Sequence, residues 1–361
     1  MLRNTHRAVA VLVGVAAALF ASGAAHAQWT VSSPDGKSAI SIGFLSQMQF
    51  EAIETADGTG CEQNLFFRRL RLMGGGRIGS RISFFFETDS PNLGKGTTTG
   101  SKTAGTVNLQ DFVLTYALDR RIKLDGGMLL LPVSHNGQQG ATSLLPVDYG
   151  PYTFSHSDPL NLSVGRDYGL QARGYLARNH FEYRVGVSQG NRGTDSRRPL
   201  CSFARAVWYP FDADTGLFYT GTTLGKRRIV AVGASLIAQQ RFLTWSGDVF
   251  LDLPLGGDAL TCQFDFTRFD GGRTFPSLDR QDDYLVEGGY LFHAARLGPF
   301  VQYARRDYAA AGLADESKLQ GGVAWWGEGH RFNLKLGVAR LTKERAEDRN
   351  QFLLQWQTLM F

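Results

Sequence analysis

Apolar and polar residues alternate with a period of two along most of the chain, and this alternation constrains the fold more than any other feature. In the segment 258–269, for example, Cys262 and Phe264 alternate with Thr261 and Gln263. Such a pattern predicts a β-strand with one apolar and one polar face. No stretch after residue 28 shows a convincing helical period.

The alternation recurs in sixteen segments. Each segment is about as long as the ~9–11 residues that a tilted strand needs to cross a lipid bilayer. The expected strands are 38–53, 65–79, 80–89, 106–118, 121–131, 165–177, 179–189, 199–209, 227–239, 242–253, 258–269, 283–295, 297–308, 317–327, 330–342 and 350–361.

The links between the expected strands alternate in length. Most links after even-numbered strands are short, and most links after odd-numbered strands are longer, as at 54–64, 90–105 and 270–282. Short turns at one end and long loops at the other are typical of outer-membrane barrels. Two links break the rule, because 210–226 is long where a short turn is expected and 240–241 is short where a long loop is expected. A strand near these links could therefore be misplaced.

The N-terminus has the three parts of a secretory signal peptide. A basic start with Arg3 and Arg7 precedes an uncharged apolar stretch, which ends in an Ala-x-Ala motif at 25–27. This pattern predicts cleavage after Ala27, so that 1–27 is removed, and an uncleaved anchor is the alternative. No uncharged apolar run of about 18 residues follows, so a membrane location would require a closed barrel.

The polar faces of the expected strands carry many full charges. In a soluble sandwich these faces would contact bulk water, whereas in a membrane barrel they line an aqueous lumen. Export, the number of strands and the charge density favour the barrel. We therefore predict an all-β fold, a transmembrane antiparallel β-barrel of about 16 strands over residues 28–361. The expected pore-lining residues are Arg69, Arg71, Glu87, Asp111, Arg173, Arg184, Asp248 and Lys335.

Several motifs resemble the phosphate-selective porin family. An Arg-Arg-x-Arg strand at 66–72 (FFRRLRL) enters a glycine-containing turn and an aromatic strand that ends at 86–89 (FETD). Similar motifs follow at 108–112 (NLQDF), 165–171 (GRDYGLQ), 218–222 (FYTGT) and 248–254 (DVFLDLP). The resemblance implies a homotrimer of sixteen-stranded barrels in the outer membrane of a Gram-negative-type bacterium, with one pore per subunit and a loop folded into each pore.

The longest link, 132–164, is the expected constriction loop, since a long link in a compact protein is usually functional or disordered. It contains no Lys or Arg. An acidic loop would face a basic wall, and we expect passive diffusion of small hydrophilic solutes with a weak preference for anions, phosphate among them. The loop residues expected at the constriction are His135, Asp148, Tyr149, His156 and Asp158.

The wall arginines also have a second interpretation, in which they pair with acidic residues and only fill the lumen. The carboxylates available for such pairs are Glu87, Asp111, Asp167 and Glu182. The sequence also leaves open whether a disulfide joins Cys61 and Cys201, because such a bond requires their two loops to lie close together.

The sequence indicates a transport protein that has no catalytic residues, cofactor or metal. The histidines show no metal-ligand spacing, and the formal net charge of +5 is too mild to indicate nucleic acid. The expected partners are outer-membrane lipid, small hydrophilic or anionic solutes and further copies of the chain. Two other classes stay open: an outer-membrane barrel enzyme of the lipase type and a soluble secreted all-β binding protein.

Overall fold

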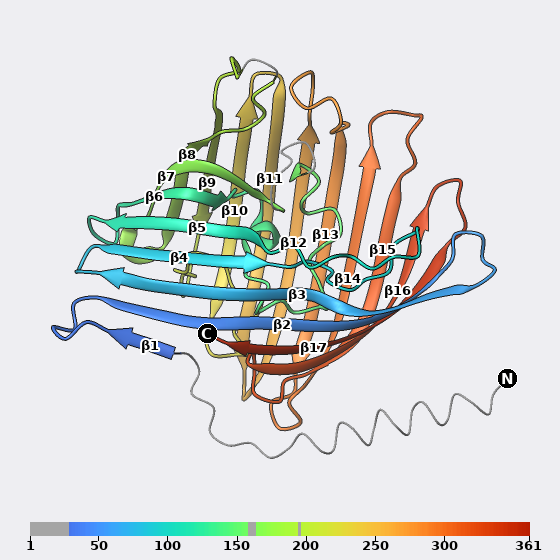
Figure 1. The fold of residues 1–361 in the computed structure, drawn as a ribbon, viewed down its shortest axis with the longest axis horizontal. Coiled ribbons are helices and arrows are strands. Elements are labelled where there is room, and N and C mark those ends of the chain that lie inside the picture. Colours follow the sequence, from blue (N-terminus) through green and yellow to red (C-terminus); the bar gives the residue numbers. More distant parts are fainter. Residues whose placement is uncertain (1–28, 158–163, 194–195) are drawn as a thin grey trace.

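Sixteen antiparallel strands, β2 to β17, close into a single barrel (Figure 1). The structure is a computed structural model that describes residues 29–157, 164–193 and 196–361, so the expected signal peptide, 1–27, lies outside the described residues. Each strand pairs with the next along the chain, and β17 pairs with β2 to close the barrel. The predicted fold class is therefore confirmed.

Every expected strand overlaps one observed strand. The two irregular links are genuine features of the chain, because the strands around them lie where the alternation predicts them. The bounds are β2 Ala39–Glu54, β3 Cys61–Ile78, β4 Ile82–Asp89, β5 Asn108–Ala117, β6 Lys123–Leu130, β7 Arg166–Leu176, β8 Phe181–Ser188, β9 Cys201–Trp208, β10 Ile229–Gln239, β11 Phe242–Leu255, β12 Asp258–Asp270, β13 Gln281–Leu291, β14 Leu297–Tyr308, β15 Glu316–Trp325, β16 Phe332–Lys343 and β17 Arg349–Met360.

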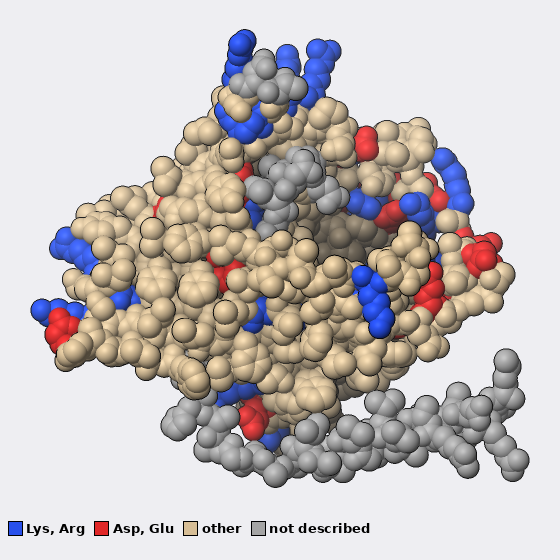
Figure 2. All heavy atoms as spheres, in the orientation of Figure 1, with Lys and Arg blue, Asp and Glu red and all other residues tan. Residues whose placement is uncertain are grey.

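The two faces of the strands differ in exposure as a membrane barrel requires. Along β11, Leu243 and Trp245 are 43% and 39% exposed, whereas Thr244 and Asp248 are 1% and 3% exposed. Uncharged side chains cover most of the outer face seen in Figure 2, and charged side chains gather mainly near its rims. The apolar face therefore points outward and the polar face points into the barrel, which reverses the arrangement of a soluble sandwich.

A short additional strand, β1 (Trp29–Ser32), was not expected. It pairs with β2 over Ala39–Ile42, beyond the last pairing of β17 at Phe44. β1 therefore continues the line of β17 along the same edge of β2. It pairs with a stretch of backbone that would otherwise lack a partner on that side, and such unpaired edges are a liability in sheets.

Two β-bulges interrupt the regular pairing close to one another. In the first, Gln47 pairs with Arg69 but its neighbour Met48 pairs with Phe67, so Arg68 is an extra residue of β3. The second bulge lies in β5, where Gln110 is skipped between the partners of Glu87 and Thr88. A bulge bends its strand and redirects a side chain.

The described part of the chain contains two short helical turns, α2 (His135–Gln138) and the 3-10 turn η1 (Ala177–Asn179). Neither is long and apolar enough to cross a membrane. All three cysteines are free, and Cys61 is exposed whereas Cys201 is buried. No disulfide therefore joins Cys61 and Cys201.

Candidate functional site

The loop between β6 and β7 folds into the barrel and reaches distant strands. It begins with α2, where the Ser134 hydroxyl accepts a hydrogen bond from the Gly137 N–H and so caps the short helix. Farther along, Gln47 of β2 and Gln357 of β17 donate to the Ala141 and Thr142 carbonyls at 3.0 and 2.8 Å. The described part of the loop thus crosses the lumen and contacts the strands at which the barrel closes.

Polar and apolar contacts together hold the loop in place. The Lys335 ammonium of β16 donates to the Pro146 carbonyl at 2.9 Å and to the Leu144 carbonyl. Next to these carbonyls, Leu145 and Val147 pack on inward-facing apolar residues of the wall. Burial of apolar surface and hydrogen bonds to the buried carbonyls together hold the loop in a fixed position.

A cavity of ≈ 810 Å³ lies between the loop and one side of the barrel wall. Strands β3, β4, β5, β6, β7 and β15 contribute to its wall, and loop residues that include Asp148 and Tyr149 line its other side. Its acidic lining residues are Asp89 and Asp148. Its basic lining residues are Arg68, Arg69, Arg71, Arg166 and Lys318. Basic side chains therefore outnumber acidic ones at the cavity surface.

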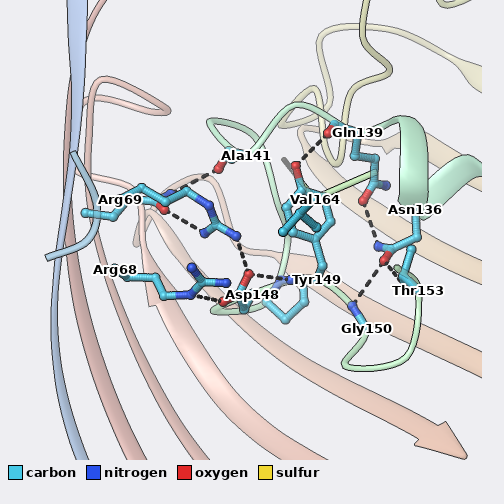
Figure 3. Close-up of polar contacts among 12 residues, drawn as sticks. Arg68, Arg69, Asn136, Gln139, Ala141, Asp148, Tyr149, Gly150, Thr153 and Val164 are labelled. Atoms are coloured by element: carbon cyan, nitrogen blue, oxygen red, sulfur yellow. Dashed lines mark hydrogen bonds and ion pairs between the residues drawn. The ribbon is translucent and has the colours of Figure 1, made fainter. Parts of the chain in front are cut away.

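Asp148 of the loop joins two arginines of β3 (Figure 3). The Arg68 Nε and Arg69 Nη2 atoms each lie 2.6 Å from one carboxylate oxygen of Asp148. Arg69 also donates to Gln47, and its guanidinium lies 5.2 Å from the centre of the Tyr149 ring. Both arginines point at the loop because the bulge in β3 places Arg68 next to Arg69 on the inward side.

The carboxyl group of Asp148 remains ionised in this setting. Burial alone would raise its pKa, but the guanidinium groups of Arg68 and Arg69 more than offset burial, and the pKa of Asp148 lies well below its ordinary value. The side chain of Asp148 is still 27% exposed and that of Arg68 is 28% exposed. The pair is therefore partly accessible from the cavity.

The loop is also braced internally next to this pair. The side-chain oxygen of Asn136 accepts hydrogen bonds from the Gly150 N–H at 3.0 Å and the Thr153 hydroxyl at 2.8 Å. The Tyr149 hydroxyl donates to the Gln139 carbonyl at 2.7 Å. These contacts join the start of the loop to its middle, so that the side chains of Asp148 and Tyr149 have defined positions.

Two further arginines of the cavity form a buried ionic network. Arg71 contacts Glu87 at 2.7 Å and Asp89 at 3.0 Å. Arg166 contacts Asp111 at 2.8 Å and Glu87 at 3.7 Å. Because each of these side chains is less than a tenth exposed, the charges compensate one another within the wall.

The wall arginines outside the cavity also have carboxylate partners. Arg173 lies 2.6 Å from Asp125, and Arg184 lies 2.7 Å from Glu182. Asp248 pairs with Arg205 at 2.7 Å. Pairing of the arginines with acidic residues is thus the rule along the inner wall, although Asp167 is engaged by backbone N–H groups instead.

Only some of the residues expected in the pore lie at the surface of the cavity. All eight expected pore-lining residues are buried on the inward face of their strands, but only Arg69 and Arg71 line the cavity. Among the loop residues, Asp148 and Tyr149 line the cavity, whereas His135 stacks on Phe250 and His156 stacks on Phe269. The remaining candidate, Asp158, lies outside the described residues.

Four basic residues with a place at these sites were not singled out from the sequence, namely Arg68, Arg166, Arg205 and Lys318. Strict alternation would turn Arg68 toward lipid, and only the bulge brings it inside. Lys318 lies at the outer end of β15, and no ion-pair partner of it is found among the described residues. Arg205 could have been found from the alternation, since it shares a face with the buried Cys201 and Phe203. Arg166 could not, because alternation groups it with the exposed Tyr168 and Leu170.

A second segment, residues 209–228 between β9 and β10, also enters the barrel and meets the loop. Tyr219 exchanges backbone hydrogen bonds with the loop, donating to the Gln138 carbonyl at 2.7 Å and accepting from the Gly140 N–H at 2.9 Å. The unexpected length of this link was the signal in the sequence. In the described residues, no group of three or more His, Cys, Asp and Glu side chains could hold a metal ion.

The barrel resembles solved porins over almost their full length. The anion-selective porin from Comamonas acidovorans has 12% identity and a TM-score of 0.57, with 89% of this chain and 99% of that chain covered. The outer-membrane channel DcaP of Acinetobacter baumannii has 12% identity and a TM-score of 0.58, with 91% and 99% covered. Salmonella typhi OmpF, solved with daunomycin, has 12% identity and a TM-score of 0.59, with 91% and 100% covered.

The family is established by sequence. No curated protein matches the chain at a significant level. The family model described as phosphate-selective porin O and P matches residues 41–234, which span most of β2, strands β3 to β9 in full, the loop between β6 and β7 and the first part of β10. With its closed barrel and this match, the chain belongs to the phosphate-selective porin O and P family and is an outer-membrane porin.

Proposed function

We propose that the pore passes small hydrophilic solutes by diffusion, with a weak preference for anions such as phosphate, and that the loop 132–164 is its constriction. The observation that supports this most strongly is the lining of the ≈ 810 Å³ cavity, in which five basic side chains face two acidic ones. Rings of Arg and Lys favour anions in pores, and the planar guanidinium group matches the oxygens of phosphate.

The preference is weak because most of the basic side chains are already compensated. Arg71 and Arg166 have buried carboxylate partners, and Arg69 shares Asp148 with Arg68. Lys318 has no such partner among the described residues and is half-buried at the cavity surface. The lining thus supports an electrostatic bias rather than a tight anion site.

Single-channel recording of the refolded protein in a planar bilayer under a KCl gradient tests this proposal. We expect discrete conductance steps, a reversal potential that favours chloride, and a smaller chloride current when phosphate is added. Lys318→Gln should lower the chloride-to-potassium permeability ratio by about threefold, because it removes one unit charge beside the path. The matched control is Lys37→Gln, which removes the same charge from an exposed turn at the opposite end of the barrel.

Three outcomes would contradict the proposal in whole or in part. A reversal potential that favours potassium in the wild-type protein would exclude an anion preference. Equal permeability ratios for Lys318→Gln and the wild type would show that the cavity lining does not act on permeating ions. A pore without selectivity or phosphate block would leave only a general diffusion channel.

We also propose that the protein acts as a homotrimer without a catalytic role, and that export removes residues 1–27. A porin with the same fold, OmpT of Vibrio cholerae, has been solved in a trimer form, which supports the oligomeric state. Native mass spectrometry of the protein extracted from membranes measures both features. Monomers alone would contradict the trimer, and a mature chain that does not begin at Gln28 would contradict the cleavage site.

A further inference from the structure

Three inward-facing carboxylates of β12 and β13 form no ion pair with any described residue. Asp265, Asp283 and Glu287 are only 4%, 6% and 4% exposed. The buried arginines of the inner wall that the structure describes all have carboxylate partners. Buried charges in proteins are normally paired or bound to a metal. These three carboxylates therefore require either bound protons or a cation.

Two of the three carboxylates meet at a cavity of ≈ 10 Å³, here called the small cavity, between the wall and the loop 132–164. A cavity of this size holds about one water molecule, and a metal ion is no larger. Thr267 of β12 pairs with Asp283 of β13, so Asp265 and Asp283 are diagonal neighbours on the inward face. Diagonal neighbours lie about 7–8 Å apart, which allows two aspartates to bind one ion.

The carboxylate of Asp265 is only half satisfied. The Asn136 N–H of α2 donates to its Oδ2 atom at 2.9 Å, whereas its buried Oδ1 atom has no hydrogen-bond partner among the described residues. Asp248 of β11, which lies opposite Asp265, is compensated by Arg205 through contacts of 2.7 and 2.8 Å. A buried charged oxygen without a partner is costly. The Oδ1 atom of Asp265 is therefore available to a ligand in the small cavity.

The carboxylate of Asp283 has hydrogen bonds from neutral groups only. The Ser155 hydroxyl donates to its Oδ2 atom at 3.1 Å, and the Gln281 amide donates to both of its oxygens at 3.0 and 3.3 Å. Arg306 of β14 acts on Asp283 from a greater distance, but its guanidinium contacts Glu316 at 2.6 Å. The negative charge of Asp283 is thus solvated but not compensated.

The remaining polar side chains around the small cavity supply further oxygens. Ser134 and Thr153 lie on the loop side and Thr267 on the wall side, and no lining side chain carries nitrogen or sulfur. The loop side is held in place by Asn136, whose side-chain oxygen accepts from the Gly150 N–H and the Thr153 hydroxyl (Figure 3). Ligand sets made only of oxygen suit Ca²⁺ and Mg²⁺ rather than Zn²⁺ or Cu²⁺.

We propose that the small cavity binds a calcium ion, which joins Asp265 and Asp283 of the wall to the loop 132–164. The two negative charges match the charge of the ion. Ca²⁺ accepts about six to eight oxygen ligands in flexible geometry, whereas Mg²⁺ demands a strict octahedron. The site has fewer than three acidic side chains, so hydroxyl oxygens and water complete the ligand shell.

The ion has a mechanical role in this arrangement. Asp148 already fastens the loop to β3 through Arg68 and Arg69. The ion fastens the same loop to β12 and β13, and its removal leaves two carboxylates that repel one another. Calcium therefore stabilises the position of the loop without taking part in the passage of solutes.

Terbium luminescence tests the site directly, because Tb³⁺ replaces Ca²⁺ at oxygen sites and is excited through a nearby tyrosine such as Tyr152 of the cavity lining. Refolded wild-type protein in detergent should give a Tb³⁺ signal that Ca²⁺ displaces. Asp265→Asn should weaken Tb³⁺ binding by about tenfold or more, because it removes a charged ligand. The matched control is Glu287→Gln, which removes a buried carboxylate outside the small cavity and should bind Tb³⁺ about as tightly as the wild type.

Heat-modifiability gives a second measurement that does not depend on luminescence. An ion that binds only the folded barrel raises the unfolding temperature by mass action. Ca²⁺ should therefore raise the unfolding temperature of the wild type and of Glu287→Gln, and a chelator should reverse the shift. Asp265→Asn and Asp283→Asn keep the shape of the side chain and should show no shift with Ca²⁺.

Three results would overturn the proposal. A folded, heat-modifiable wild-type barrel without a Tb³⁺ signal that Ca²⁺ displaces would exclude the ion. Equal Tb³⁺ affinity in the wild type, Asp265→Asn and Asp283→Asn would place the ion elsewhere. An unfolding temperature that responds to acid but not to Ca²⁺ would show that the carboxyl groups hold protons instead. None of these measurements depends on conductance, so failure of the calcium site and failure of the pore function can be told apart.

Discussion

Asp148→Asn should make the pore more selective for anions. The change removes one of the two acidic side chains from the cavity lining and leaves the guanidinium groups of Arg68 and Arg69 without their shared carboxylate. The asparagine oxygen can still accept the Tyr149 N–H, which the Asp148 carboxylate now accepts at 2.9 Å. The substitution therefore changes the charge with little change in shape.

The expected magnitude follows from Coulomb's law. A unit charge about 7 Å from a permeating ion in water contributes roughly 0.6 kcal/mol, and screening at about 0.1 M salt halves this energy. The energy has opposite signs for chloride and potassium, so the difference between the two ions returns to roughly 0.6 kcal/mol. The chloride-to-potassium permeability ratio should therefore rise about threefold. The depressed pKa of Asp148 keeps the wild-type carboxyl ionised at neutral pH, so the full charge is lost.

The assay is the reversal potential under a KCl gradient, compared with two further variants. Asp35→Asn removes the same charge from an exposed turn and should leave the ratio unchanged. Arg68→Gln combined with Asp148→Asn removes opposite charges and should return the ratio close to that of the wild type. An unchanged or lower ratio for Asp148→Asn alone would refute the reasoning, because it would mean that ions do not pass this cavity.

Three other perturbations test how the lumen is held together. Lys335→Met leaves two loop carbonyls without their donor, at a cost of about 1–3 kcal/mol each, and should increase current flicker and proteolysis of the loop. Burial lowers the pKa of His330 to about 4 from an ordinary 6.5, so this ring favours the folded state above pH 6.5 and loses that contribution, up to about 3 kcal/mol, as the pH falls through 4. In heat-modifiability assays, His330→Gln should therefore lose less stability on acidification than the wild type, and an equal loss would contradict this role. Gly174→Ala places a Cβ atom on the Arg121 carbonyl and should cost about 1–3 kcal/mol, whereas Gly247→Ala meets open space and should not lower the unfolding temperature.

The strands and the orientation of their faces could be predicted from the sequence because both depend on local alternation. Leu243 is apolar and its neighbour Thr244 is polar, so the sequence predicts that they lie on opposite faces of the strand. The structure places Leu243 outward and Thr244 inward. That the link 132–164 is more than a turn could be predicted from its length alone, and the structure shows its described part folded into the barrel. The alternation of apolar and polar residues and the lengths of the links were therefore sufficient to predict the fold.

The partners within the lumen could not be predicted, because they come from distant parts of the chain. His330 contacts the carbonyl of Thr222, 108 residues away, and neither residue belongs to a recognisable motif. The inward position of Arg68 depends on a register shift that alternation cannot reveal. The pairing of Asp148 with Arg68 and Arg69 depends both on a contact between distant segments and on the bulge. The electrostatics of the cavity could therefore not be predicted from the sequence.

The two bulges are positions at which insertion or deletion of a single residue can change the lining of the cavity. Because side-chain direction alternates along a strand, an extra residue such as Arg68 or Gln110 adds a lumenal group without replacing one that is already there. Loss of that single residue would restore regular pairing and leave the flanking side chains on the faces they occupy now. Insertions and deletions of one codon at these two points could therefore tune the charge of the pore between related proteins while the rest of the barrel stays the same.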